Sequence, residues 1–171
     1  YAGCVRDSTN KQIGVLTKIA FNGDTVWQRI YRDPDPDEDV IPQMVTGSVD
    51  GGFLITGFFQ HWTQHYSRCL LIKTDAQGNE LWRKKIGKVA PDVQDGKAIV
   101  QDSASKKIVI CGYQYVGQNS DLLDNILVLD SLGAKIEHVG FIEGAGLDMI
   151  QASDKSIIIA GGYFPIHPSF P

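Results

Sequence analysis

Short apolar runs separated by clusters of turn residues recur along most of this chain of 171 residues. The runs are rich in β-branched and aromatic residues and are bounded by Gly, Asp, Asn and Ser, which is typical of β-strands. Clear examples are the segments 53–59, 108–113 and 157–161. One segment, 121–132, also fits a helix on its spacing of Leu and Ile, but its place in the repeat described next favours a strand. The pattern therefore predicts an all-β protein.

A sequence repeat organises these runs. Gly23, Gly78 and Gly133 are spaced 55 residues apart, and each follows an apolar run. Trp27 and Trp82 occupy equivalent positions just after the first two glycines, whereas the third copy has a glutamate there. We expect the two tryptophans to pack between neighbouring sheets. The other residues assigned to this structural motif are Asp75, Asp130, Gly57, Gly112 and Gly161.

Each complete repeat supplies four predicted strands, named a to d in chain order. Four short antiparallel strands in a unit of about 40–50 residues predict a β-propeller blade. Since joining the chain's own ends would give about three blades, fewer than the usual 4–8, we expect a segment of a longer propeller. The alternative is a ring of several copies, in which strands a and b of one copy complete strands c and d of the next. The predicted units are a half-blade at 1–31, full blades at 40–87 and 97–141, a half-blade at 147–163 and a Pro-rich tail at 164–171.

Composition narrows the classes of function. The formal net charge is −4 and the Lys and Arg residues are scattered, so the chain lacks the clustered positive charge of a nucleic-acid-binding protein. No apolar run approaches the ~20 residues of a membrane-spanning helix, so we expect no membrane insertion. The three cysteines occupy non-equivalent positions in the repeat and do not form a disulfide framework.

Long connections on one face of the predicted ring are the expected place for binding residues, because loops on a rigid scaffold usually carry function. The connection 32–39 ends in a run of seven residues with five carboxylates, and the connection 60–68 holds two histidines and two aromatic residues. We expect both to emerge on the same side of one blade. The candidate ligand-binding residues are Trp62, Tyr66, His61, His65, Asp35, Asp37 and Asp39.

Two kinds of ligand suit these residues. Carboxylates beside exposed aromatic rings suit a sugar, which stacks on the rings and hydrogen-bonds to the oxygens. Calcium would favour an oxygen-rich loop, although the spacing is not that of an EF-hand. The spacing of His61 and His65 would align their rings only on a helix. A loop that is simply solvated is the third interpretation, so we assign no cofactor and keep calcium as the alternative.

Two segments of the repeat resemble a known family: residues 71–82, which are its fullest copy, and residues 50–57. Their pattern is similar to the repeat of large secreted and cell-surface β-propeller proteins of Bacteroidetes-type bacteria. Asp75, Gly78 and Trp82 also resemble the Asp-x-x-Gly-x-x-x-Trp motif of quinoprotein-like propellers. The resemblance covers nearly the whole chain and implies a propeller architecture and an extracytoplasmic location. It does not imply quinone chemistry, because the shared motif is the one that packs blades together.

We therefore expect a non-enzymatic scaffold or binding module from a larger extracytoplasmic bacterial β-propeller protein. Its expected partners are a protein or a glycan, and further blades of the same polypeptide or further copies of the chain. No nucleophile elbow, phosphate loop or zinc-protease motif occurs in the sequence. The alternative is a fragment of a propeller-fold enzyme, such as a glycoside hydrolase, whose active-site residues lie largely outside this chain.

Overall fold

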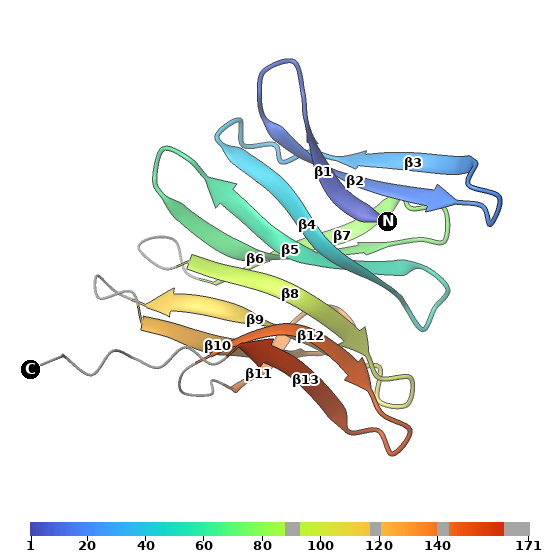
Figure 1. Cartoon of the computed structure of the whole chain (residues 1–171), viewed down its shortest axis with the longest axis vertical. Helices are drawn as coiled ribbons and strands as arrows, with labels where there is room; N and C mark the ends of the chain where they lie inside the picture. Colours follow the sequence, from blue (N-terminus) through green and yellow to red (C-terminus); the bar gives the residue numbers. More distant parts are fainter. Residues whose placement is uncertain (88–92, 117–120, 140–143, 163–171) are drawn as a thin grey trace, which may run out of the picture.

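The computed structural model describes residues 1–87, 93–116, 121–139 and 144–162, which form 13 strands and no helix (Figure 1). The prediction of an all-β protein is confirmed. The ambiguous segment 121–132 contains strand β10 (Asp121–Leu129), which pairs along its whole length with β9 (Ile108–Val116). A strand is favoured here because Leu127 and Leu129 are buried between two sheets.

Two antiparallel sheets of four strands each form the middle of the molecule. The first contains β4 (Glu38–Gly47), β5 (Phe53–His61), β6 (Tyr66–Thr74) and β7 (Glu80–Ile86). The second contains β8 (Val93–Gln101), β9, β10 and β11 (Lys135–Val139). A single parallel residue pair, Ser67 with Val93, connects them. We therefore describe them as two separate sheets, in each of which the strands follow one another in chain order.

Two smaller antiparallel sheets complete the described structure. One contains β1 (Ala2–Arg6), β2 (Gln12–Ile19) and β3 (Thr25–Tyr31), and the other contains β12 (Ala145–Gln151) and β13 (Ile157–Gly162). By their places in the repeat, β1 to β3 correspond to strands b, c and d, and β12 and β13 correspond to strands a and b. The strands thus follow the predicted order.

The four sheets lie face to face in one stack, with β1–β3 at one end and β12–β13 at the other (Figure 1). Apolar side chains fill each space between neighbouring sheets. The two middle sheets are covered on both faces, which explains near-continuous apolar runs such as 108–110. The buried residues of the three cores include, in stack order, Leu16, Val40 and Phe59; Leu54, Leu71 and Ile110; and Ala98, Cys111 and Met149.

The tight turns between strands c and d explain the spacing of the repeat glycines. Gly23, Gly78 and Gly133 have φ angles of 93°, 78° and 76°, in the left-handed region that residues with a side chain rarely adopt. In the second and third copies, Asp75 and Asp130 each accept hydrogen bonds from the backbone N–H groups two and four residues ahead. Aspartate and glycine therefore shape the same turn in each of these copies.

Trp27 and Trp82 connect neighbouring sheets at these turns, as the sequence predicts. A Cβ atom added to Gly78 would lie 2.8 Å from the indole of Trp27, and one added to Gly133 would lie 3.0 Å from the indole of Trp82. The corresponding position at Gly23, at the end of the stack, has no neighbouring atom within 4 Å. The glycine of each inner turn thus makes room for the tryptophan of the preceding sheet.

Some expectations fall outside the described residues. The tail 164–171 is not described, and neither are parts of the connections after β7 and β9. The three cysteines all belong to the described residues and form no disulfide, and two of them are buried. Within the described ranges there is no helix whose length and apolar content would let it cross a membrane.

Candidate binding groove

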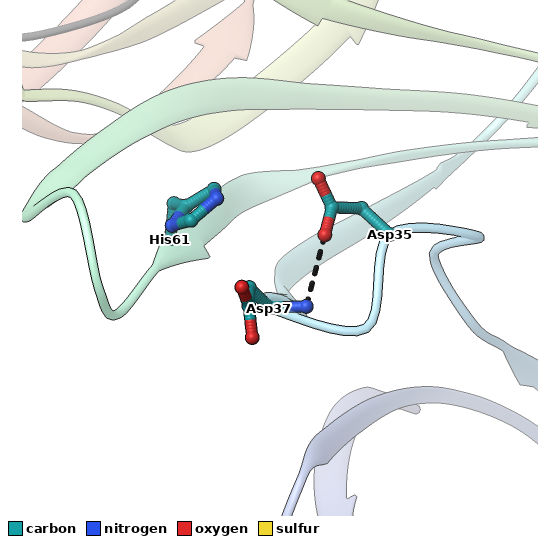
Figure 2. A group of neighbouring side chains, drawn as sticks. All are labelled: Asp35, Asp37 and His61. Atoms are coloured by element: carbon teal, nitrogen blue, oxygen red, sulfur yellow. Dashed lines mark hydrogen bonds between the residues drawn. The ribbon is translucent and has the colours of Figure 1, made fainter.

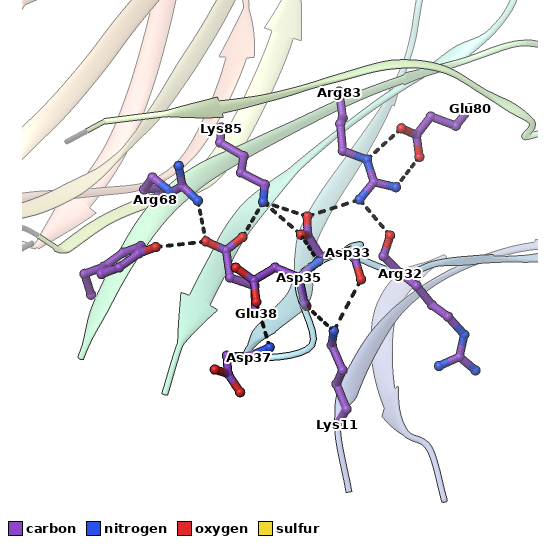
Figure 3. A network of polar contacts seen from close by, with 11 residues as sticks. Lys11, Arg32, Asp33, Asp35, Asp37, Glu38, Arg68, Glu80, Arg83 and Lys85 are labelled. Atoms are coloured by element: carbon purple, nitrogen blue, oxygen red, sulfur yellow. Dashed lines mark hydrogen bonds and ion pairs between the residues drawn. The ribbon is translucent and has the colours of Figure 1, made fainter. Parts of the chain in front are cut away.

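The acidic segment 33–39 leads from β3 into the start of β4, and three of its carboxylates, those of Asp33, Glu38 and Asp39, are buried. Figure 3 shows Asp33 and Glu38 beside the neighbouring strands. Glu38 forms ion pairs with Arg68 of β6 and Lys85 of β7. Lys85 also contacts Asp33 at 2.9 Å, and both carboxylate side chains are only 1% exposed. Because a buried carboxylate without a partner is costly, these ion pairs hold the connection against the sheet.

The surroundings of Glu38 determine its protonation state. Burial would raise its pKa, but the hydrogen bonds from Lys85 and Arg68 together outweigh that effect and hold the pKa below its ordinary value. Tyr66 donates a further hydrogen bond to the same carboxylate at 3.1 Å. Burial and this hydrogen bond raise the pKa of Tyr66. Glu38 is therefore ionised at neutral pH and acts as an anchor for the loop, not as a proton donor.

The turn between β1 and β2 faces the acidic connection from the neighbouring sheet. Lys11 donates hydrogen bonds to the backbone oxygens of Asp33 at 3.3 Å and Asp35 at 2.6 Å. Arg6 donates to the backbone oxygen of Asn10 at 2.8 Å. Lys11 thus ties the turn of the first sheet to the backbone of the acidic connection.

Trp62 lies between these two segments, directly after β5. Its Nε1 donates a hydrogen bond to Oδ2 of Asp39 at 2.7 Å, and Oδ1 of Asp39 accepts one from the backbone N–H of Gln12 at 3.1 Å. These bonds orient the indole while Trp62 remains 47% exposed. The result is a groove of about 400 Å³, lined by Arg6, Thr9, Asn10, Lys11, Pro36, Asp37, Asp39 and Trp62.

Asp35, Asp37 and His61 lie close together beside this groove, with potential ligand atoms within 4.8 Å of one another (Figure 2). Two carboxylates and one imidazole do not match calcium, which takes about 6–8 oxygen ligands. Nδ1 of His61 accepts a hydrogen bond from the backbone N–H of Gln64 at 3.3 Å. These three side chains by themselves therefore supply too few oxygens for a calcium site.

The structure gathers the predicted residues near one end of β4 and β5 but gives them different surroundings. Trp62 and Asp37 line the groove. Asp39, His61 and Tyr66 are only 2–5% exposed, although their positions in acidic and polar loops suggested surface groups. The reason is that Asp39 and Tyr66 are held in buried hydrogen bonds, while His61 packs against Tyr66 with 5.1 Å between ring centroids.

Sequence reasoning missed the contribution of the β1–β2 turn. Arg6, Thr9 and Lys11 belong to a connection that looks like an ordinary polar turn, and no local motif singles them out. Only the packing of the first sheet on β4 brings them to the groove. The predicted residue His65 is exposed in the β5–β6 turn with a φ of 53°, outside the groove lining.

No protein-family model matches the chain, and no curated protein is significantly similar to it in sequence. Its function therefore has to be argued from the geometry of the groove and of the sheets that carry it.

Proposed function

We propose that the four stacked sheets are consecutive blades of a β-propeller and that the protein is a non-enzymatic binding module, which takes a glycan in the groove at Trp62. In this proposal the module belongs to an extracytoplasmic bacterial protein. The arrangement of the sheets and the chemistry of the groove support separate parts of the proposal.

Repeated geometry supports the propeller arrangement. The two middle sheets are four-stranded antiparallel meanders, as propeller blades are. Neighbouring sheets pack face to face, and the same tryptophan-to-glycine contact recurs from the first sheet to the second and from the second to the third. A contact that recurs in the same sense between successive units is expected when each unit is rotated by a similar angle about one axis.

The observation that carries the glycan proposal is the half-exposed, hydrogen-bonded indole of Trp62. A sugar ring can place its C–H face on such an indole while its hydroxyl groups reach polar neighbours. Arg6, Asn10 and Asp37 supply donors and acceptors around it. A groove of about 400 Å³ suits a small saccharide.

The carboxylates of the groove favour binding over hydrolysis. Glycoside hydrolysis usually requires two carboxyl groups that act on the same bond. Asp39 already accepts hydrogen bonds through both oxygens, from Trp62 and Gln12. Among the groove residues, this leaves Asp37 as the carboxylate available to a ligand.

Glycan-array screening followed by isothermal titration calorimetry tests the proposal. We expect Trp62→Ala to weaken binding of the selected saccharide by about 10–100-fold, or about 1.4–2.8 kcal/mol. Trp62→Phe retains an aromatic face and loses only the N–H group, so it should bind with intermediate affinity.

The matched control is Leu132→Ala, which removes another exposed apolar side chain from the distant β10–β11 turn and should bind like the wild type. Wild-type affinity in Trp62→Ala would refute the groove assignment. Release of a hydrolysis product by the wild type would instead favour the enzyme interpretation.

A further inference from the structure

We infer that Asp35, Asp37 and His61 form a subsite for two neighbouring hydroxyl groups of the saccharide, beside the indole of Trp62. This inference rests on the proposed function and deepens it by naming the class of saccharide, which is one with a free vicinal diol and no acidic group at that position. The central evidence is that one buried donor and two carboxylates surround a common point, and each has a hydrogen-bonding position still free.

His61 supplies the buried donor. The residue is only 4% exposed, and its ring is held against the ring of Tyr66. Nδ1 lies 3.2 Å from Oγ1 of Thr63 and accepts the hydrogen bond from the backbone N–H of Gln64. Because Nδ1 acts as an acceptor, Nε2 is the N–H donor of the ring. Nε2 has no hydrogen-bond partner among the described residues, and a buried donor without one is costly, so an acceptor on a ligand would stabilise it.

Asp35 and Asp37 supply the acceptors. Oδ1 of Asp35 accepts a hydrogen bond from the backbone N–H of Asp37 at 2.9 Å. Within the described ranges, Oδ2 of Asp35 and both carboxylate oxygens of Asp37 accept no hydrogen bond, and neither residue forms an ion pair. Both side chains are exposed, so their remaining oxygens are available to hydroxyl donors of a ligand.

The spacing of the three groups suits an oxygen atom. A ring nitrogen of His61 and oxygens of the two carboxylates lie within 4.8 Å of one another, and Figure 2 shows the three side chains grouped around one point. An oxygen placed among three atoms at that separation lies within about 2.8 Å of all of them, which is the ordinary length of an O–H···O hydrogen bond.

A vicinal diol satisfies donor and acceptors together. One hydroxyl accepts a hydrogen bond from Nε2 of His61 and donates its own proton to Asp35, and the neighbouring hydroxyl donates to Asp37. A cation would meet the Nε2 proton at the same point, and an acidic sugar would meet two carboxylates of like charge. The chemistry of the subsite therefore favours an uncharged diol.

The subsite is fixed beside the stacking surface. Trp62 directly follows His61, and its backbone N–H donates to the backbone oxygen of Asp37 at 3.4 Å. Asp37 also lines the groove together with Trp62. A sugar ring stacked on the indole thus has its edge near the free groups of the subsite. Because these contacts exist before a ligand arrives, little ordering has to accompany binding.

Isothermal titration calorimetry of the full chain tests the inference. The probes are the methyl glycosides of glucose, galactose and mannose, which present vicinal diols in different orientations, and their monodeoxy analogues. We expect at least one parent glycoside to bind. Removal of either hydroxyl of the recognised diol should weaken its binding about tenfold or more, because a polar group of the protein then stays unpaired.

Asp37→Ala connects the selectivity to the residue. This variant should bind the parent glycoside about tenfold more weakly, and it should no longer distinguish the parent from the analogue that lacks the hydroxyl facing Asp37. Lost discrimination measures the coupling between that hydroxyl and the side chain, which a merely structural role of Asp37 would not produce. Glu137→Ala is the matched control: it removes an exposed carboxylate from β11 and should bind and discriminate like the wild type.

Three results would overturn the inference. Equal affinity of the wild type for a parent and all of its monodeoxy analogues is the first, and no measurable binding of any of the three glycosides is the second. The third is binding of CaCl₂ or ZnCl₂, titrated alone, to the wild type but not to Asp37→Ala, which would identify a metal site instead. In each case an array-selected saccharide whose binding still depends on Trp62 would leave the proposed function standing.

Discussion

At the scale of single residues, contacts between indoles and glycines determine how the sheets stack. Trp27 lies against Gly78 and Trp82 lies against Gly133. In both cases a cation two residues further along the same strand lies over the ring, at 5.4 Å or 6.0 Å from its centroid. Each indole is therefore in contact with its own strand as well as with the next sheet, which makes it the residue whose loss should matter most at each junction.

Trp82→Ala should lower the free energy of unfolding by about 2–3 kcal/mol, somewhat less than the 3–5 kcal/mol typical of a fully buried aromatic residue, because Trp82 is only partly buried. Urea denaturation monitored by circular dichroism measures this change. Leu81→Ala is the control on the same strand: Leu81 is 58% exposed, and its loss should cost less than about 0.5 kcal/mol. Equal costs at the two positions would argue against the tryptophan contact.

At the scale of elements, the connection from β3 to β4 combines a buried and an exposed part. Asp33 and Glu38 are tied to cations of β6 and β7, whereas Asp37 is exposed at the groove. The buried ion pairs hold the segment in place, and this lets the exposed residues keep a defined position beside Trp62. Structural and binding roles thus fall on neighbouring residues of one loop.

The anchor at Glu38 should make stability depend on pH. Its pKa is lowered in the folded state, so its ionised form stabilises the fold above the unfolded pKa of about 4.3, and this contribution is lost as the pH falls through the folded pKa. We expect Glu38→Gln to lower the free energy of unfolding at pH 7 by about 2–3 kcal/mol, because Lys85 and Arg68 lose their shared anion. Denaturation curves between pH 7 and acidic pH should be flatter for this variant than for the wild type.

Asp37→Asn is the control for this comparison, since its carboxylate is exposed and has no ion pair in the described structure. Its stability and its pH profile should match those of the wild type. A pH profile of Glu38→Gln as steep as that of the wild type would show that other carboxylates govern acid stability.

At the scale of the whole molecule, stability comes from apolar cores between sheets. Each of the three cores combines side chains from two neighbouring sheets. The middle sheets contribute to two cores each, while each end sheet contributes to one. Apolar residues remain exposed at the ends, among them Ile30 at 53% on the first sheet and Ile150 at 59% on the last.

The far-ultraviolet circular dichroism spectrum of the full chain should show β-structure without the double minimum of α-helix. The physical reason is that the apolar runs are strand-length and lack helix caps, so no stable helix is expected in their place. A clear helical signal would contradict first of all the assignment of β10, the segment whose apolar spacing also fits a helix.

The order and location of the strands were predictable from the sequence. Strand position depends on local chemistry: β-branched and aromatic runs, the aspartates and glycines that form turns, and the spacing of 55 residues that aligns one repeat with the next. The same alignment predicted the contacts of Trp27 and Trp82, because equivalent positions in a repeat meet equivalent neighbours. It also resolved segment 121–132 in favour of a strand.

The character of the acidic loop was not predictable in this way. Glu38 is buried because Arg68 and Lys85, which are 30 and 47 residues away in sequence, come from two other strands to meet it. The cations that face the loop from the first sheet depend likewise on how that sheet packs on β4. Local patterns report turn chemistry and strand propensity, but they do not report which distant charges a carboxylate will meet.

The sequence by itself thus determined the all-β class, the strand order and the repeating turns of this protein, because these depend on neighbouring residues and on a regular spacing. Only the tertiary structure decided that Asp39 and Tyr66 are buried and that Trp62 stays exposed in a groove. Those outcomes depend on the packing of one sheet against the next, which brings together residues that no local pattern relates.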